Sequence, residues 1–281
     1  MRILLLGGRG VFGTEFFNLC KKNKILIKSP KSTELNIVKI EKVKKYIQKY
    51  KPTHIVNSAV FMGIDPCHDN YKKAFEVNAL SVLNLSKICN ENNITFIQTS
   101  THAVFDGNKS KPYNESDQPL QNNVYGATKY SAESFVSSIC KKFYIVRFPT
   151  MYGKRKNKVK GFVDKMLIKL KKNEKILVAK DKMDSVSYAK DLSACLINII
   201  KKKFTYGIYH IQNHGFISYY EFIKYLKKKV KSKSKVIPVK DSYFKSKNFK
   251  PLKTSITSIK LKKLRGWKEA LKDYLQSERI I

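Results

Sequence analysis

Two residues able to hold and transfer a proton, Tyr125 and Lys129, stand four positions apart within the segment 121–133. On a helix, this spacing puts both side chains on one face, about one turn apart. A phenol keeps its proton up to about pH 10, and we expect the neighbouring ammonium to lower that pKa by stabilising the phenolate. Such a tyrosine could pass a proton to a developing alkoxide near neutral pH. Because the same spacing is common by chance on surface helices, the interpretation depends on Thr101 and on a glycine loop.

Near the N-terminus, Gly7, Gly10 and Gly13 lie between an apolar strand pattern, residues 2–6, and the helical pattern of residues 12–22. A dinucleotide-binding fingerprint requires this context. Its first glycine permits a tight turn, its second lets the backbone approach the pyrophosphate, and its third lets helix and strand pack closely, while amides at the helix N-terminus bind the phosphates. An ordinary tight turn is the plainer alternative. The residues predicted to contact the cofactor here are Gly7, Arg9, Gly10, Val11, Phe12 and Gly13.

The end of the second predicted strand, Ile25–Lys28, bears on the choice between NAD and NADP. An NAD site usually places an acidic residue there for the ribose 2′-hydroxyl, whereas a basic residue suits the 2′-phosphate. Here the strand ends in Lys28, no acid follows until Glu34, and Arg9 lies inside the glycine loop. We therefore expect NADPH (NADP) as the preferred cofactor and NAD as the alternative. The plainer interpretation is that Lys28 is one more solvated lysine in a lysine-rich chain.

Strand and helix patterns alternate along the chain. The predicted strands span residues 2–6, 25–28, 54–58, 95–99, 143–147 and 207–211, and the predicted helices span residues 12–22, 37–49, 73–92, 125–141, 162–172, 191–200, 219–229 and 266–277. This alternation predicts an α/β fold: a doubly wound, mostly parallel sheet (Rossmann-type) with helices on both faces. Right-handed crossovers then bring the cofactor site to the carboxyl ends of the strands.

We expect a second, smaller α/β domain that binds substrate and is interwoven with the first. The dinucleotide-binding domain is predicted to comprise residues 1–148 and 189–212, and the substrate-binding domain residues 149–188 and 213–281.

Composition bounds the function classes. Of 281 residues, 42% are hydrophobic and 12% aromatic, so a packed globular protein is expected rather than a disordered one. No apolar run approaches the ~20 residues of a membrane span, and the short first strand is no signal peptide. The five scattered cysteines favour neither disulfides nor zinc, and fit the reducing cytoplasm. We predict no metal site.

The formal net charge of +36 is extreme and admits two interpretations. A polyanion-binding surface would attract nucleic acid or a phosphate-bearing substrate. However, the lysine runs are spread along the chain near predicted helix ends, where cations suit the helix dipole. We favour a lysine-biased composition with a secondary benefit for anionic substrates, and expect no specific nucleic-acid partner.

Taken together, these motifs resemble those of the extended short-chain dehydrogenase/reductases, and within them those of the dTDP-4-dehydrorhamnose reductases and related nucleotide-sugar reductases. The resemblance covers nearly the whole length. It is carried by the segments 7–13, 56–59, 77–79, 100–101, 104–107, 125–129, 147–153, 188–192 and 207–210, and by the helix of Trp267.

The resemblance implies a catalytic set of Thr101, Tyr125 and Lys129. In this family, the tyrosine protonates the keto oxygen while hydride reaches the carbon, the hydroxyl binds that oxygen, and the lysine holds the nicotinamide ribose. It also implies cytoplasmic synthesis of a surface-polysaccharide sugar and allows a homodimer. Further residues that it places at the cofactor are Asn36, Ile37, Asn57, Ser58, Ala59 and Asn78.

Departures from the family pattern concern the sugar pocket. Relatives usually read Ser-Thr-Asp-Tyr-Val-Phe, where this chain has Ala103 instead of the tyrosine, and a tryptophan where this chain has Thr150. Loss of two aromatic residues implies a differently shaped pocket and a changed sugar. The residues that the resemblance implies for substrate binding are His102, Ala103, Val104, Phe105, Thr150 and Tyr152.

Two other functions remain open. A nucleotide-sugar epimerase uses the same tyrosine–lysine pair but cycles a tightly held NAD. A catalytically silent regulatory subunit is less favoured, because such a protein has no need of Thr101, Tyr125 and Lys129 together.

Overall fold

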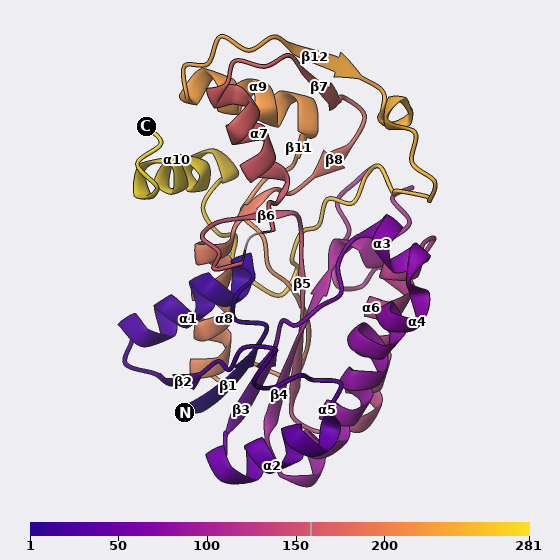
Figure 1. Ribbon diagram of the computed structural model, residues 1–281, viewed down its shortest axis with the longest axis vertical. Helices are drawn as coiled ribbons and strands as arrows, with labels where there is room; N and C mark the ends of the chain where they lie inside the picture. Colours follow the sequence, from indigo (N-terminus) through magenta and orange to yellow (C-terminus); the bar gives the residue numbers. More distant parts are fainter. Residues whose placement is uncertain (158) are drawn as a thin grey trace.

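A computed structural model describes residues 1–157 and 159–281 of the chain. Two parts are visible in Figure 1: one built around a central sheet that holds the N-terminus, and one in which short strand pairs pack with the C-terminal helix.

Six parallel strands form the central sheet in the order β10-β5-β4-β3-β1-β2, which confirms the predicted mostly parallel α/β fold. Their bounds are β1 Arg2–Leu6, β2 Leu26–Lys28, β3 His54–Asn57, β4 Thr95–Thr101, β5 Phe143–Phe148 and β10 Gly207–His210. Since β1 pairs with both β2 and β3, the chain reverses its direction of travel across the sheet there. A crevice for a ligand is expected at the carboxyl ends of these strands.

Helices cover both faces of the sheet (Figure 1). Helices α1 (Val11–Lys22) and α8 (Ala189–Lys201) share one hydrophobic cluster with the sheet. The helices α2, α5 and α6 share the other, with bounds Ile40–Tyr50, Ser81–Glu91 and Val124–Ile139. Successive residues of β1 alternate between the clusters, Ile3 in the first and Leu4 in the second, as the period of two in a strand requires.

The long helix predicted over residues 73–92 is interrupted. Helix α4 (Tyr71–Phe75) passes into a π-helical turn, Glu76–Leu80, before α5 begins. The turn contains Asn78, whose side chain is buried. Single π turns within helices occur frequently at functional sites, and apolar periodicity alone gives no sign of one.

The second part is built from strand pairs and helices of the C-terminal half. One hydrophobic cluster contains side chains of α7 (Phe162–Lys171), α9 (Tyr219–Lys229) and α10 (Trp267–Ser277), together with side chains of the strand pairs given next. The strand pairs are β6 (Met151–Tyr152) with β9 (Ser187–Tyr188), β7 (Ile176–Ala179) with β12 (Val236–Val239), and β8 (Met183–Asp184) with β11 (Ile217–Ser218). The remaining short helix, α3, spans Ile64–Asp69.

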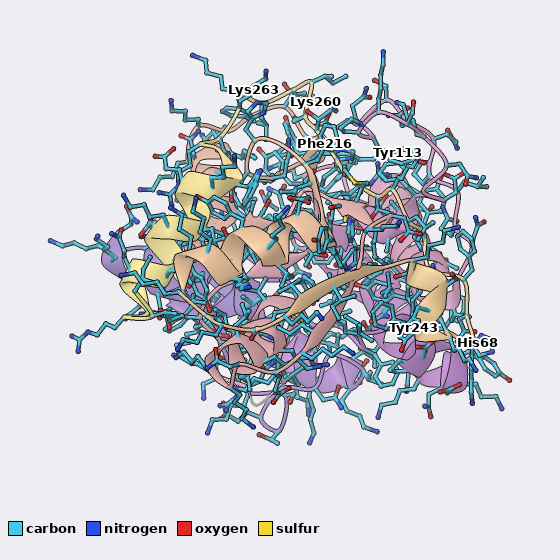
Figure 2. The ribbon with its side chains drawn as sticks, turned by 90° about the horizontal axis from the view of Figure 1, so that it is seen from above. His68, Tyr113, Phe216, Tyr243, Lys260 and Lys263 are labelled. Atoms are coloured by element: carbon cyan, nitrogen blue, oxygen red, sulfur yellow. The ribbon has the colours of Figure 1, made fainter. Side chains whose placement is uncertain are left out.

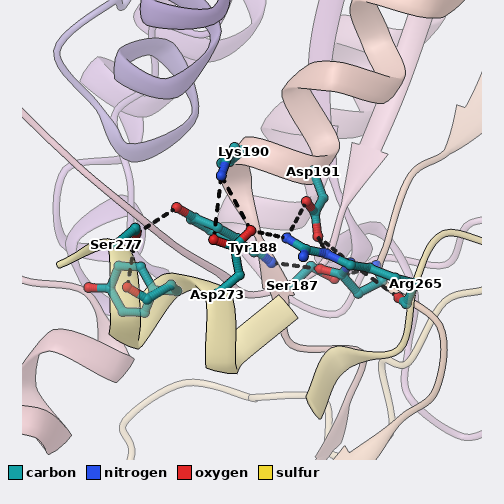
Figure 3. Close-up of polar contacts among 9 residues, drawn as sticks. Ser187, Tyr188, Lys190, Asp191, Arg265, Asp273 and Ser277 are labelled. Carbon is teal, nitrogen blue, oxygen red and sulfur yellow. Dashed lines mark hydrogen bonds and ion pairs between the residues drawn. The ribbon is translucent and has the colours of Figure 1, made fainter. Parts of the chain in front are cut away.

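A group of ion pairs joins α8 of the first part to α10 of the second (Figure 3). Arg265 donates to Asp191 on α8 and to Asp273 on α10, at 2.8 and 2.7 Å. Lys190 Nζ adds a contact of 3.3 Å to Asp273. Arg265 therefore links two helices that are about eighty residues apart in sequence.

Side chains tipped with nitrogen project around the whole outline of the molecule in Figure 2 rather than from one edge. This distribution fits the expectation of a lysine-biased composition. None of the helices in residues 1–157 and 159–281 is long and apolar enough to cross a membrane. Over the same residues, no cluster of three or more His, Cys, Asp or Glu side chains could hold a metal ion.

Candidate active site

Thr101 and Tyr125 meet at the carboxyl edge of the sheet. Thr101 is the last residue of β4, and Tyr125 lies in the first turn of α6. The Thr101 hydroxyl lies close enough to the Tyr125 phenol to lower its pKa as a hydrogen-bond donor, and it also accepts the backbone N–H of Ala103 at 3.1 Å. Gly126 permits this approach, because a Cβ there would lie 2.5 Å from the carbonyl oxygen of Ala103. Asn123 begins the helix by accepting the backbone N–H of Gly126 at 2.8 Å, as an N-cap residue should.

Lys129 reaches the same edge from the next turn of α6. Its Nζ donates to the carbonyl oxygen of Thr99 at 2.7 Å, two residues before Thr101 on β4. The side chain is buried. Burial lowers the pKa of Lys129 to about 8, although the charge of Glu133, one turn further along α6, acts in the opposite direction.

The expected lowering of the Tyr125 pKa is wrong in this structure. Burial raises the pKa of Tyr125 to about 12, and the hydrogen bond with Thr101 offsets only part of that rise. The ammonium group of Lys129 donates to Thr99 rather than to the phenol, and it does not lower the pKa of Tyr125. The phenol therefore remains protonated at neutral pH.

The glycine loop lies at the switch point of the sheet. Gly7 has φ +81°, and a Cβ on it would come within 2.4 Å of the backbone nitrogen of Ala59. A Cβ on Gly13 would lie 2.4 Å from the carbonyl oxygen of Gly7, so this glycine permits the close packing of α1. At Gly10 a Cβ would meet only one atom within 4 Å, at 3.7 Å, which leaves this side of the loop open.

The start of α1 suits a phosphate group. Gly10 is the N-cap, it supplies no side-chain cap, and the first turn contains no acidic residue. The first amides of a helix have no intrahelical acceptor and attract anions. The amides of Val11 and Phe12 thus fit a dinucleotide pyrophosphate at the open side of the loop.

The segment after β3 is hydrogen-bonded to the end of β1, from which the glycine loop starts. Ser58 Oγ donates to the carbonyl oxygen of Leu6 at 2.9 Å, and Asn57 accepts the backbone N–H of Ala59 at 3.2 Å. Asn78 binds both backbone groups of Phe61 and donates to Thr128 Oγ1 at 3.1 Å.

The side-chain amides of Asn57 and Asn78 are thus used within the protein. Of the segment after β3, the backbone near Ala59 remains for contact with a cofactor. These two asparagines position the loop, and their contact with a cofactor stays a prediction.

The residues predicted to lie near the cofactor's ribose each have their own contacts in the structure. Lys28 ends β2 and its Nζ lies 4.9 Å from the ring centre of Tyr50. Arg9 is exposed and donates to the carbonyl oxygen of Lys156 at 3.1 Å. Asn36 is exposed and accepts the N–H of Val38, whereas Ile37 is buried in the sheet cluster.

Of the residues expected to bind substrate, half are buried in the protein interior. Val104 and Phe105 belong to a small apolar cluster, and Tyr152 stacks on Tyr188 with ring centres 5.6 Å apart. Each of the three is at most 1% exposed. In this conformation the three side chains pack against protein, and their contact with a substrate stays a prediction.

The other three residues are His102, Ala103 and Thr150. The first two directly follow Thr101 in the chain, and the third is linked to their neighbours. His102 and Ala103 belong to the 3₁₀ turn that follows β4. Thr150 is bonded to Tyr219 and Asp184. Sequence reasoning missed both of these partners, since nothing distinguishes Asp184 in the sequence from the nearby Asp181.

Comparison with known proteins gives consistent matches. A family model described as RmlD substrate binding domain matches residues 1–280. A dTDP-4-dehydrorhamnose reductase of Aggregatibacter actinomycetemcomitans is 30% identical over 79% of this chain and 76% of its own length. The spore coat polysaccharide biosynthesis protein SpsK of Bacillus subtilis is 26% identical over 98% of this chain and 97% of its own.

A solved structure extends the match to three dimensions. The dTDP-4-dehydrorhamnose reductase of Bacillus anthracis, solved in complex with NADP, superposes with a TM-score of 0.93 at 26% identity. The match covers 98% of this chain and 99% of that one.

Proposed function

Since the chain belongs to the RmlD substrate-binding domain family, we propose that it reduces the 4-keto group of a nucleotide-linked 6-deoxy sugar. The observation that carries this proposal is the contact of Thr101 with Tyr125 at the sheet edge where the glycine loop opens. The family places the chain among NAD(P)-dependent oxidoreductases. As its relative SpsK is named for polysaccharide biosynthesis, we propose a role in making a surface-polysaccharide sugar.

Each proposed catalytic residue has one role. The nicotinamide cofactor, when bound, supplies hydride to the keto carbon. Tyr125 holds a proton at its phenol oxygen and releases it to the oxygen that gains negative charge. A raised pKa suits this direction of reaction, because the phenol stays protonated until an alkoxide, a stronger base, forms beside it.

Thr101 and Lys129 bind the keto oxygen and the cofactor, respectively. The Thr101 hydroxyl binds the keto oxygen and stabilises its developing charge. Lys129 lies one helical turn from Tyr125 with its ammonium bonded to Thr99 of β4, and we propose that it holds the nicotinamide ribose.

We propose NADPH as the preferred cofactor, on the support of two cations, Lys28 and Arg9, near the end of β2 and in the glycine loop. Lys28→Asp should raise KM for NADPH about tenfold or more, because a charge-assisted bond to the 2′-phosphate is lost. KM for NADH should change much less. The matched control is Lys24→Asp, two residues before β2 begins. Equal KM changes for both cofactors would contradict the NADPH preference.

Activity should fall as pH rises through about 8. Burial lowers the pKa of Lys129 to about that value, so the ammonium loses its charge in the upper part of the usual assay range. The kcat/KM profile of the free enzyme should show this basic limb. It should vanish in Lys129→Arg, whose guanidinium stays charged. A wild-type profile that is flat to pH 9.5 would contradict a role for the Lys129 charge.

The direct test mixes the protein, NADPH and dTDP-4-keto-6-deoxy sugars and follows the absorbance of the reduced nicotinamide. Reduction predicts stoichiometric loss of that absorbance. The second candidate, epimerisation, predicts that a bound cofactor is never consumed while the sugar changes configuration. Absence of any turnover with a panel of nucleotide sugars would leave a binding or regulatory protein.

Three further points belong to the proposal. We propose the division into a dinucleotide-binding domain (1–148 and 189–212) and a substrate-binding domain (149–188 and 213–281), supported by separate hydrophobic clusters. We propose a cytoplasmic location, where both the cofactor and nucleotide sugars occur. We also propose a homodimer, for which light scattering of the purified protein is the test.

A further inference from the structure

A cavity of about 660 Å³ opens at the amino ends of the central strands. Its lining includes the first residues of β3 and β4, His54 and Thr95. Thr95 and Thr101 are the two ends of β4, and a strand rises about 3.3 Å per residue, so about 20 Å of strand separates the cavity from the candidate catalytic edge. Sites for small organic ligands have volumes of roughly 300–1,000 Å³. The cavity is therefore large enough for such a ligand and is separate from the candidate active site.

Four lysines from three separate segments of the chain line this cavity. They are Lys24 after α1, Lys142 before β5, Lys201 at the end of α8 and Lys203 two residues later. Among the described residues that line the cavity, none is acidic. Within residues 1–157 and 159–281, none of the four lysines forms an ion pair with a carboxylate. Like charges gathered in one hollow repel one another, and a bound anion removes that repulsion.

The lysine-rich composition of the chain is the plainer explanation for these cations. Lys201 lies in the last turn of α8, where the helix dipole favours a positive charge. Lys24 and Lys142 lie outside the helices, so the dipole does not account for their position. Composition explains many exposed lysines, but it does not explain their convergence on a hollow that has no acidic lining residue.

An aromatic pair lies in the same cavity. Tyr206, directly before β10, is 44% exposed. Its ring centre lies 5.2 Å from that of Tyr144 on β5. Tyr144 is buried, and its hydroxyl donates to the carbonyl oxygen of Phe204 at 2.7 Å. The fixed ring of Tyr144 thus supports Tyr206, whose exposed ring is available to stack on a flat ligand group such as a nucleobase.

We propose that this cavity binds a nucleoside polyphosphate, with the phosphates against the four lysines and the base stacked on Tyr206. Lysines alone would suit any phosphate compound, and the aromatic pair is what favours a nucleotide. The enclosed shape favours a small ligand over a nucleic acid, which contacts proteins over an extended surface. The site is additional to those for the substrate and the cofactor of the proposed reaction.

The end of α9 supplies a closely matched control for the end of α8. Lys201 is the last residue of α8 and Lys229 is the last residue of α9. Two residues further on, Lys203 and Lys231 have φ of +50° and +52°. Lys201→Glu/Lys203→Glu and Lys229→Glu/Lys231→Glu therefore change the net charge equally, at equivalent positions of a helix end and in equivalent backbone conformations. Only the first pair lines the cavity.

The measurement is calorimetric titration of the whole protein with ATP and with inorganic triphosphate, without divalent metal ions. Saturating NADPH and dTDP are present to occupy the candidate active site. Wild type should bind one ATP per chain. Lys201→Glu/Lys203→Glu should raise Kd for ATP about tenfold or more, and Lys229→Glu/Lys231→Glu by about threefold at most.

Two single variants test the other parts of the site. Tyr206→Ala should weaken ATP binding about tenfold and leave the affinity for inorganic triphosphate unchanged, because only ATP has a base to stack. Lys142→Glu, on a different segment of the chain, should also weaken ATP binding, so the test does not depend on the end of α8 alone. All variants should keep the wild-type rate of NADPH oxidation, since none of these residues lies at the candidate active site.

Other results would overturn the proposal. Absence of saturable ATP binding by the wild-type protein would show that the cavity takes no nucleotide. Equal losses in the two double variants, or unchanged ATP affinity in Lys142→Glu, would mean that ATP responds only to the overall charge. Inorganic triphosphate that binds as tightly as ATP, or a Tyr206→Ala variant with wild-type ATP affinity, would refute the contact between base and tyrosine.

Discussion

Tyr125→Phe should lower kcat for reduction by about 10²- to 10⁴-fold, the usual contribution of a positioned general acid. The substitution removes one oxygen and leaves the ring, which is half-buried at the start of α6. The glycine loop, its neighbour Ala59 and Lys129 are unchanged. Affinity for NADPH, measured by fluorescence titration, should therefore stay within a few-fold of wild type.

A matched control lies five residues further along the same helix. Tyr130 is also partly buried, and packs against the small cluster around Phe105. Tyr130→Phe should keep wild-type kcat, because among the described residues its hydroxyl makes no hydrogen bond to Thr101, Tyr125 or Lys129. Full activity in Tyr125→Phe would refute the proton-donor role. A loss of cofactor affinity that matches the loss of kcat would assign Tyr125 to binding instead.

The second large effect concerns stability. Arg147→Met should destabilise the protein by about 3–5 kcal/mol, the cost of leaving a buried charge without its partner. Arg147 is 1% exposed and binds Glu133 through two nitrogens, with a shortest distance of 2.6 Å. Its guanidinium also lies 5.2 Å from the ring centre of Phe105. We expect a fall in melting temperature of about 10 °C.

The double variant Arg147→Met/Glu133→Met tests the cause of that loss. If the unpaired carboxylate is responsible, removing it should restore much of the stability, because apolar residues often replace buried ion pairs at little cost. The exposed pair Lys44–Glu41, 3.0 Å apart, supplies the control. Lys44→Met should change stability by at most about 1 kcal/mol. A single Arg147 variant that melts like wild type would contradict this account.

Local sequence signals predicted those elements whose ends are fixed by nearby residues. Helix α9 has the predicted bounds, 219–229, since Ser218 accepts the N–H of Glu221 at 3.1 Å and begins the helix there. By contrast, the helix predicted from Ile37 begins three residues later, at Ile40. Ile37 is buried but lies before the helix. An apolar period reports which side chains are buried, not where the helical hydrogen bonds start.

The strands of the second part, which pair with distant partners, were not predicted. Strand β7 pairs with β12, and about sixty residues separate Ile176 from its partner Val236. Strands β6, β8, β9 and β11 are two residues long each, too short for an alternating pattern to emerge. Their existence depends on tertiary contacts that no local window of sequence contains.

In the candidate site too, residues of local motifs were predicted and residues brought in by distant contacts were not. Thr101, Tyr125 and the glycines belong to motifs whose spacing is read along the chain, and the structure brings them to one edge of the sheet. Asp184 and Tyr219 come to His102 from β8 and α9. The pKa of Tyr125 also depends on burial, which raises it, whereas the lowering by Lys129 that the sequence suggested is not found.

Transfer of hydrogen from the cofactor to the sugar is the central claim, and isotopic labelling tests it most directly. Wild-type protein is incubated with NADPH carrying deuterium at the transferring position of the nicotinamide and with a dTDP-4-keto-6-deoxy sugar. The product is then examined by NMR and mass spectrometry. Our account predicts one deuterium at C4 of the sugar for each cofactor oxidised. A sugar product without deuterium, or an inverted sugar beside unoxidised cofactor, would contradict it.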